Sequence, residues 1–265
     1  MTLTPLPADL EKHNVRQRNY FERQDRPKMR PADTYYVNRQ VDELISYLGL
    51  KRGDRVLDVG CGMGRHTPVL LRRGLVVEGI DITPGLLEKL RQSGGEIASI
   101  PLHLGDVAAP PEALLGRFDA AIGFFTLHHL HDLKACFLGM ASVIVPGGQI
   151  GFVEPNPYNP LYYVQMLVQP GMTWSGDKGM LKMRPAVLSK AIREAGLVSL
   201  PWVRFGAFPP RRRQPELGAP GGAPARTSAS SAACPSVPAD WCPKARVGAG
   251  MKSGRKRLPH EGIVT

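Results

Sequence analysis

The stretch Val56-Leu57-Asp58-Val59-Gly60-Cys61-Gly62-Met63-Gly64 decides the fold of this chain. The apolar residues of its first half indicate a buried strand, and the glycines at every second position of its second half predict a tight turn. The apolar run Val69-Leu70-Leu71 that follows predicts the first turns of a helix. Glycine removes side chains where the backbone must turn sharply and a ligand must approach closely. The stretch therefore predicts a strand, a ligand-binding loop and a helix.

The spacing of the glycines narrows the kind of ligand. A dinucleotide-binding loop has the pattern G-x-G-x-x-G, and Arg65 stands where its third glycine belongs. A nicotinamide-dependent reductase is therefore disfavoured. The pattern G-x-G-x-G preceded by an acid resembles motif I of the class I S-adenosylmethionine-dependent methyltransferases. This resemblance implies S-adenosylmethionine as the cofactor, with its methionine end held by the following residues: Asp58, Gly60, Cys61, Gly62 and Gly64.

A second acid follows the next predicted strand. Residues 75–80 are apolar except for one glutamate and one glycine, and they end at Asp81, 23 residues beyond Asp58. A nucleoside-binding fold places at this point an acid that accepts hydrogen bonds from the ribose hydroxyls. An acid at a strand end is also common as a helix cap. The glycine loop in the same unit favours the ribose role, and Ile82 is then expected to face the adenine ring.

The third and fourth predicted strands add further cofactor residues. Residues 97–104 form the third strand, which closes with Asp106 and Val107. The family resemblance implies that Asp106 accepts a hydrogen bond from the adenine amino group and that Val107 lies beside the ring. Residues 118–125 form the fourth strand, and Phe125 at its carboxyl end is expected at the cofactor.

Histidines gather after the fourth strand, at His128, His129 and His131. A metal site is disfavoured because these histidines lie on a predicted turn without a nearby Cys or Glu at metal-ligand spacing. Ligands of parallel sheets bind outside the carboxyl ends of the strands, so this edge should face the transferred methyl group. His129 is the predicted general base, and Glu154 at the end of the fifth strand is the second candidate.

The residues after the fifth strand bear on the acceptor. Asn156-Pro157-Tyr158 is similar to the Asn-Pro-Pro-Tyr of methylases that act on base amines, but that motif belongs after the fourth strand. Its place after the fifth argues against such a methylase. Methionines and tyrosines between residues 161 and 183 suit an apolar acceptor, although methionine is as often plain core. Residues 187–196 are predicted to form a helix and residues 198–208 the sixth strand.

The N-terminal segment, residues 1–36, begins with ten residues expected to be disordered. Residues 10–24 predict a polar helix with Tyr20 and Phe21 on one edge. In proteins that this chain resembles, such a segment often folds over the cofactor and helps to form the acceptor pocket. The alternative, that the helix is solvated and its aromatic residues simply pack on the core, is equally open.

The C-terminal segment, residues 209–265, differs in composition from the rest. Residues 211–265 contain seven Gly, seven Pro, ten Lys/Arg and three Asp/Glu, a net charge of +7 out of the total +11. This composition predicts disorder. Two explanations are open: a genuine basic tail that meets an acidic partner or nucleic acid, or a frame-shifted end of a GC-rich gene. The frame shift is favoured because the family fold expects a seventh strand here and none is evident.

Composition sets the remaining limits. The chain has 265 residues, 43% of them apolar, enough for one sizeable core. It shows no segment typical of a signal peptide and no apolar run as long as a membrane span. Four cysteines without metal-site spacing are consistent with a reduced cytoplasmic protein. Outside the tail the charge is only mildly basic, so nucleic-acid binding does not follow from the total.

These patterns together predict a doubly wound, mostly parallel α/β sheet of Rossmann-like type over residues 37–208, with the strand order 3-2-1-4-5-(7)-6 and without the usual seventh strand. The predicted function is methyl transfer from S-adenosylmethionine to a small acceptor, such as a lipid, a quinone-like compound or a secondary metabolite. Two alternatives are a non-catalytic S-adenosylmethionine-binding protein and an RNA methyltransferase that uses the basic tail. The sequence predicts no metal, and it leaves the oligomeric state open.

Overall fold

A computed structural model describes residues 8–22, 27–160, 163–164, 178–205, 246–247 and 263–264. Its centre is a sheet of five parallel strands in the order β3-β2-β1-β4-β5. The strands are β1 (Arg55–Val59), β2 (Val76–Asp81), β3 (Leu102–Leu104), β4 (Phe118–Phe124) and β5 (Ile144–Glu154). The predicted order of these five strands and the doubly wound α/β fold are confirmed.

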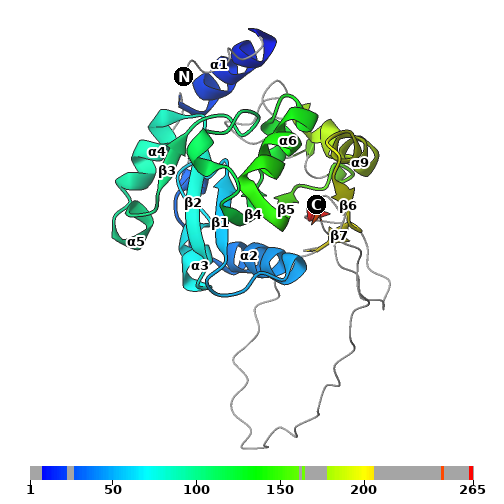
Figure 1. The fold of residues 1–265 in the computed structure, drawn as a ribbon. Helices are drawn as coiled ribbons and strands as arrows, with labels where there is room; N and C mark the ends of the chain where they lie inside the picture. The colour runs from blue at the N-terminus through cyan, green and yellow to red at the C-terminus, as the bar shows by residue number, and fades with distance from the viewer. Residues whose placement is uncertain are drawn as a thin grey trace, which may run out of the picture.

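Helices cover both faces of this sheet (Figure 1). One face carries α2 (Tyr35–Leu48), α3 (Thr67–Arg72) and α4 (Pro84–Arg91), whose apolar residues pack on one set of strand residues. The other face carries α6 (Leu133–Val143) and α9 (Pro185–Glu194), which pack on the alternate set. Neighbouring residues of β1, Val56 and Leu57, thus enter different cores, as the alternation of a strand requires.

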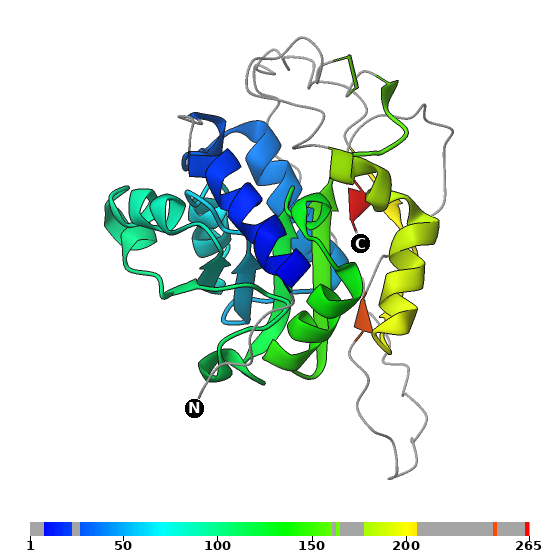
Figure 2. The same ribbon diagram turned by 90° about the horizontal axis from the view of Figure 1, so that it is seen from above.

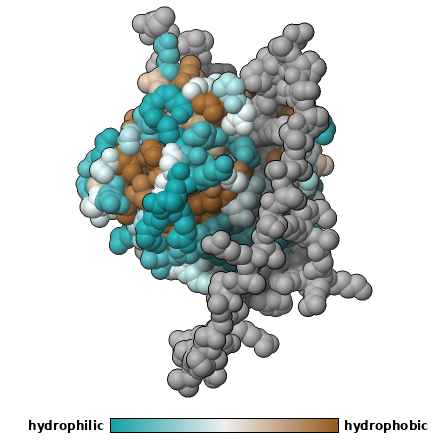
Figure 3. All heavy atoms as spheres, turned by 60° about the horizontal axis from the view of Figure 1, so that its bottom comes forward, coloured by the Kyte–Doolittle hydropathy of each residue, from teal (hydrophilic) through white to brown (hydrophobic). Residues whose placement is uncertain are grey.

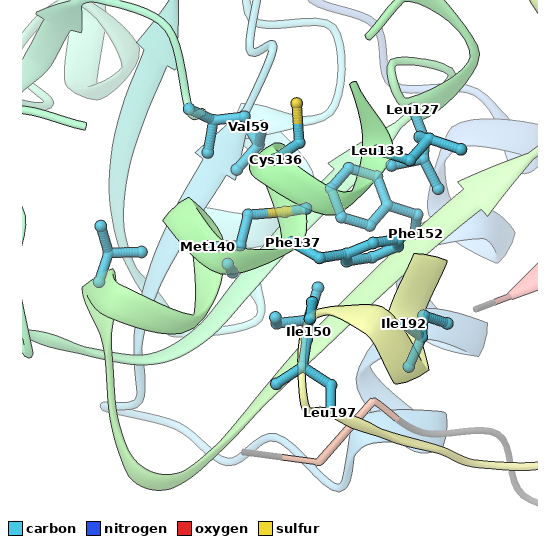
Figure 4. Packing of buried hydrophobic residues seen from close by; sticks show 14 of the residues in the cluster. Val59, Leu127, Leu133, Cys136, Phe137, Met140, Ile150, Phe152, Ile192 and Leu197 are labelled. Atoms are coloured by element: carbon cyan, nitrogen blue, oxygen red, sulfur yellow. The ribbon is translucent and has the colours of Figure 1, made fainter. Parts of the chain in front are cut away.

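The core under α6 and α9 is dense and aromatic (Figure 4). Phe137 and Met140 of α6 lie against Phe152 and Ile150 of β5, and each of the four side chains is fully buried. Ile192 of α9 closes the same cluster. This core fixes the carboxyl end of β5, where Glu154 lies.

Shorter elements complete the described chain. They are α1 (Ala8–Glu22), η1 (Pro27–Met29), α5 (Gly95–Ala98), η2 (Glu112–Leu114), η3 (Leu127–His129) and η4 (Lys178–Met183). Met180 and Met183 of η4 are fully buried in the core of α6 and α9. These two methionines are therefore core residues, and the other two of the Met-rich stretch lie outside the described residues.

The sheet changes character beyond β5. The predicted sixth strand over residues 198–208 is wrong in its extent: the structure has only β6 (Val198–Ser199) and β7 (Val203–Arg204). Pro201, which has no N–H to donate to a neighbouring strand, stands between the two, and residues 206–208 lie outside the described chain. Within the described part, a seventh strand of ordinary length is absent, as predicted.

Two dipeptides of the C-terminal segment reach the sheet. β8 (Arg246–Val247) pairs in parallel with β5 and β6, and β9 (Ile263–Val264) pairs antiparallel with β5 and β7. Disorder was predicted for the whole segment, and these four residues are an exception to it. The rest of the basic tail lies outside the described residues, so its disorder and its origin stay predictions.

Several predicted boundaries shift. Residues 97–104 were predicted as one strand, but the short helix α5 takes 95–98 and β3 begins only after Pro101. Helix α1 begins at Ala8, so residues 8–10 are not disordered, and α2 begins at Tyr35, before the predicted domain boundary at residue 37. Thr34 caps α2 by accepting a hydrogen bond from the Val37 N–H, which fixes the start of that helix.

The described surface is mixed in character. On the face drawn in Figure 3, hydrophilic residues lie between patches of hydrophobic ones. No helix in the described ranges is long and apolar enough to cross a bilayer.

Candidate active site

The glycine loop between β1 and α3 forms the floor of the site. Gly60, Gly62 and Gly64 have φ of 70°, 53° and 79°, a region that side chains other than glycine rarely adopt. A Cβ added to Gly60 would lie 2.2 Å from Cγ2 of Thr126, just after β4. The loop therefore packs directly against the segment that follows β4.

Cys61, within this loop, points away from any such ligand. Its side chain is 7% exposed, and its Sγ lies only 2.7 Å from where a Cβ on Gly79 would be. Burial raises the pKa of the Cys61 thiol well above its usual range. The side chain is thus a packing element, and any contact of this residue with the predicted cofactor would come from its backbone.

Asp81, at the end of β2, is joined to the loop. Its Oδ2 accepts a hydrogen bond from the Gly62 N–H at 3.0 Å, and its Oδ1 accepts one from the Thr83 N–H at 2.8 Å. Burial raises the pKa of Asp81, and these backbone donors oppose the rise. The carboxylate is held at the edge where the prediction expects the ribose hydroxyls, with Ile82 half-buried beside it.

Asp58, on the neighbouring strand β1, has no such partner among the described residues. It is 4% exposed, and none of the described residues donates a hydrogen bond to its carboxylate. Burial, and then the charge of Asp81, raise the pKa of Asp58 to about 7. A buried carboxylate without a donor is costly, so this position favours a ligand that brings a cation.

Asp106 and Val107 follow β3 and lie at the same edge. Asp106 Oδ1 accepts a hydrogen bond from the Ala108 N–H at 2.8 Å, and its Oδ2 accepts one from Nδ2 of Asn14 at 2.6 Å. Asn14 comes from α1, a partner that the sequence did not indicate. The side chain of Val107 is 4% exposed and belongs to the core of α6.

The backbone after β4 is strained. Phe125 is the one residue other than glycine, within the described ranges, that has a positive φ, at 56°. Its N–H donates to the Val153 carbonyl, which ties this turn to β5. Residues held in such conformations cluster at functional sites. Next to it, Phe124 stacks on His66 at 4.0 Å, and burial lowers the pKa of His66 to about 3.

The two histidines of η3, His128 and His129, have different surroundings. Glu154 pairs with His128, not with His129: His128 Nδ1 lies 2.6 Å from Glu154 Oε2. The other carboxylate oxygen of Glu154 accepts the N–H groups of Thr126 and Leu127, at 2.8 and 2.6 Å. The side chains of His128 and Glu154 are both buried, at 4% and 0% exposed respectively. Glu154 is thus fully engaged as an acceptor, and it orients the His128 ring.

His129 turns toward α1. Its ring meets Phe21 edge-on, with centroids 5.0 Å apart, and lies 4.0 Å from the ring of His128. Its carbonyl oxygen accepts a hydrogen bond from Nε2 of His13 at 2.9 Å. The predicted base therefore lies next to a better-oriented histidine, between that histidine and the N-terminal helix. No three His, Cys, Asp or Glu residues of the described chain lie together in a way that suits a metal ion.

Helix α1 covers this edge of the sheet. Seen from above, it crosses the molecule over the ends of the strands (Figure 2). Its residues reach Asp106 after β3 and His129 after β4, and it packs beside α4. Of the two alternatives for this segment, a lid over the site agrees with these contacts better than a helix that only buries its aromatic residues.

Comparison with known proteins matches this geometry. A family model described as a methyltransferase domain matches residues 56–148. These residues match a methyltransferase domain, and the sheet has the fold of the class I S-adenosylmethionine-dependent methyltransferases. The matched range begins within β1 and ends within β5, so it includes the glycine loop and all three acids.

Two relatives and one solved structure illustrate the similarity. A demethylmenaquinone methyltransferase of Tropheryma whipplei (strain Twist) is 34% identical over 109 residues, 40% of this chain and 44% of the relative. A ubiquinone biosynthesis O-methyltransferase of Alkalilimnicola ehrlichii is 30% identical over 172 residues, 60% and 66% of the two chains. The structure of a geranyl diphosphate methyltransferase in complex with GPP and sinefungin superposes with a TM-score of 0.54 at 16% identity, over 73% and 83%. The chain thus spans between 44% and 66% of the length of these two curated relatives.

The residues present fit S-adenosylmethionine, the cofactor of this family. Asp58, which accepts no hydrogen bond among the described residues, would pair with the ammonium group of its methionine end, and Asp81 would accept the hydroxyls of its ribose. The glycine loop would let the cofactor approach the backbone closely between these two carboxylates.

Sequence reasoning did not single out two residues that the structure brings to this edge of the sheet, His128 and Asn14. His128 stands beside His129 in the sequence, and only the position of Glu154 on the neighbouring strand distinguishes them. Asn14 lies 92 residues from Asp106, and its polar helix gives no signal for that contact.

Proposed function

We propose that this chain transfers the methyl group of S-adenosylmethionine to a phenolic or enolic hydroxyl compound, or to the ring carbon next to that hydroxyl. The observation that carries the proposal is the buried carboxylate of Asp58, unpaired among the described residues, beside a glycine loop that is hydrogen-bonded to Asp81. The sulfonium of the bound cofactor supplies an already activated methyl group. Catalysis then rests on holding the acceptor in line with it and removing the acceptor's proton.

Each acid has one task in this proposal. Asp58 accepts the ammonium group, and Asp81 accepts the ribose hydroxyls with the lone pairs that Gly62 and Thr83 leave open. Asp106 accepts the adenine amino group. The glycines contribute backbone N–H groups and space, and Phe125 and Ile82 contribute apolar surface.

His128 is the proposed general base, oriented by Glu154. Because the Glu154 carboxylate accepts from Nδ1, the His128 ring carries its proton there and presents Nε2 as an acceptor. Glu154 also stabilises the imidazolium that forms when Nε2 takes the proton of the acceptor hydroxyl. Glu154 is thus a positioning residue rather than a base. His129, beside it, is the alternative base.

A phenolic or enolic acceptor explains why a base is present. Such a hydroxyl becomes a strong nucleophile at oxygen, or at the adjacent carbon, only after it loses its proton. The relatives support an acceptor of this kind, since their names refer to quinone biosynthesis. Two aromatic residues at this edge, Phe21 of α1 and Phe125 just after β4, suit a flat apolar ring.

The test is a titration followed by a turnover assay. Calorimetric titration of S-adenosylmethionine into the purified chain should show micromolar binding, and Asp81→Ala should weaken it at least tenfold. S-adenosylhomocysteine release is then measured with a panel of catechols, hydroquinones and enolic polyketide mimics. Binding that produces no release with any of them would make the chain a non-catalytic cofactor-binding protein. If the folded chain does not bind at all, the cofactor assignment itself fails.

A further inference from the structure

The carboxylate assigned to the adenine amino group already has an amide partner. Asp106 Oδ1 accepts a hydrogen bond from the Ala108 N–H, and Oδ2, which none of the described backbone N–H groups reaches, accepts one from Nδ2 of Asn14 at 2.6 Å. We propose that Asn14 latches helix α1 over the site by taking the place of the adenine amino group, and that cofactor binding releases this latch. The inference rests on the proposed function, because it needs Asp106 at the adenine.

The two competing groups are chemically alike. A carboxamide presents a planar NH₂ donor beside a carbonyl acceptor, and the edge of adenine presents a planar NH₂ donor beside the ring N1 acceptor. Both offer the same donor to one carboxylate oxygen. Asn14 is 7% exposed, so its amide is buried against Asp106 rather than solvated beside it. A short hydrogen bond to a carboxylate is among the stronger kinds, which suits a latch.

The rest of α1 is weakly held. Of its 15 residues only Leu10 and Asn14 are buried, so the helix gains little from apolar burial. The hydrogen bond of Asn14 to Asp106, with the contacts of His13 and Phe21 to His129, is therefore among the few contacts that keep α1 in place. A helix held in this way can move when one contact is replaced.

Movement of α1 would also change the acceptor side. The same helix places His13 on the carbonyl of His129 and Phe21 on the ring of His129. If adenine displaces Asn14 from Asp106, α1 shifts, and the contacts of His13 and Phe21 that cover His129 are loosened as well. The expected consequence is an order of binding in which the cofactor enters first and opens the place for the acceptor.

The first experiment compares two asparagine variants on the same helix. Asn14→Ala removes the latch, whereas Asn19→Ala makes the same chemical change at an exposed position of α1 and controls for the gain in helix propensity. S-adenosylhomocysteine, which binds without turnover, is titrated into each full-length chain. We expect Asn14→Ala to bind it about three- to tenfold more tightly than the wild type, the worth of one competing hydrogen bond, and Asn19→Ala to match the wild type.

The second experiment observes the helix itself. Hydrogen exchange of the amides between residues 10 and 20 should rise in the wild type when S-adenosylhomocysteine is added. In Asn14→Ala it should already be raised without ligand, and in Asn19→Ala it should follow the wild type. Asn14→Asp, which places a negative charge against Asp106, should release α1 in the same way and covers the case in which Asn14→Ala folds poorly.

The failure of the latch and the failure of the proposed function give different results. Weaker or unchanged binding in Asn14→Ala, with wild-type exchange in α1, would overturn the latch, since Asn14 would then support the adenine or play no part. Loss of binding in the wild type as well as in Asp81→Ala would instead overturn the cofactor assignment. The ligand-free exchange of Asn14→Ala tests the latch in either case.

Discussion

The residues on the two sides of the proposed site are held in place by different kinds of contact. On the cofactor side, Asp81 is fixed by backbone N–H groups of the adjacent loop and turn, all within 19 residues of it. On the acceptor side, His128 is fixed by a side chain on another strand, and His129 is covered by residues of α1 that lie more than one hundred positions away. The cofactor side is therefore local and backbone-based, and the acceptor side depends on long-range side-chain contacts. Substitutions should affect the two sides differently.

The largest effect is expected on the acceptor side. His128→Ala should lower kcat by about 10² to 10⁴ with little change in cofactor affinity, because it removes the proposed base. Glu154→Gln keeps the shape but not the charge, and should lower kcat about tenfold to a hundredfold. His129→Ala is the matched control and should stay within about tenfold of the wild type. Equal losses in the two histidine variants would contradict the assignment to His128.

The packing beneath the acceptor side gives the next effect. Phe152 is fully buried, and a Cβ on Gly123 would lie 2.3 Å from its ring. Phe152→Ala should lower the free energy of unfolding by about 3–5 kcal/mol. Val198→Ala, in the two-residue strand β6 and 45% exposed, should change it by less than about 0.5 kcal/mol. Urea denaturation measures the free energy of unfolding of both variants. Similar losses in the two would show that the short strands contribute as much to stability as β5 does.

A smaller effect is expected in the glycine loop. Gly60→Ala combines a positive φ with a Cβ 2.2 Å from Thr126, so it should shift the loop and weaken S-adenosylmethionine binding at least tenfold. Gly116→Ala is the matched control: its φ is 64°, but nothing lies within 4 Å of the added Cβ. That variant should lose about 1–2 kcal/mol of stability and keep its cofactor affinity. Equal affinity in the two variants would mean that the loop does not form the floor of the site.

The difference between local and long-range contacts also explains which of the candidate residues the sequence could predict. The loop, Asp58 and Asp81 lie in one strand–helix–strand unit, and their spacing alone placed them correctly in the fold. The choice between His128 and His129 depends on the register of β4 against β5, where Phe124 pairs with Val153 and so brings Glu154 next to Thr126. Register between distant strands is not determined by local spacing, so the sequence alone gave no reason to prefer His128 to His129.

The end of the sheet was harder to predict for a related reason. Residues 198–208 have the apolar content of a strand, but Pro201 interrupts the pairing, and the remaining contacts come from dipeptides near the C-terminus. The composition of that segment gave no sign that Arg246–Val247 and Ile263–Val264 pair with the sheet. Pairing of such short strands is set by the partner they meet, not by their own propensity.

The smallest expected effect concerns the protonation of Asp58. Burial and the charge of Asp81 raise its pKa from 3.8 to about 7 in the cofactor-free chain, so the folded state keeps a proton that the unfolded state loses. The stability from Asp58 is therefore fully present below about pH 4 and lost as the pH rises through 7. Asp58→Asn, which cannot ionise, should raise the melting temperature relative to the wild type at about pH 8 and not at about pH 4.

Cofactor binding should follow the opposite trend, because the ammonium group pairs with ionised Asp58. Wild-type affinity for S-adenosylmethionine should increase several-fold between about pH 6 and pH 8, and that of Asp58→Asn should be lower and flat over this range. Glu112→Gln, at an exposed position of η2, is the control and should titrate as the wild type does. A parallel pH dependence in Asp58→Asn would show that the backbone-fixed side of the site binds its ligand without help from this carboxylate. The destabilisation that comes from burying the Asp58 carboxylate without a hydrogen-bond donor would then be unrelated to cofactor binding.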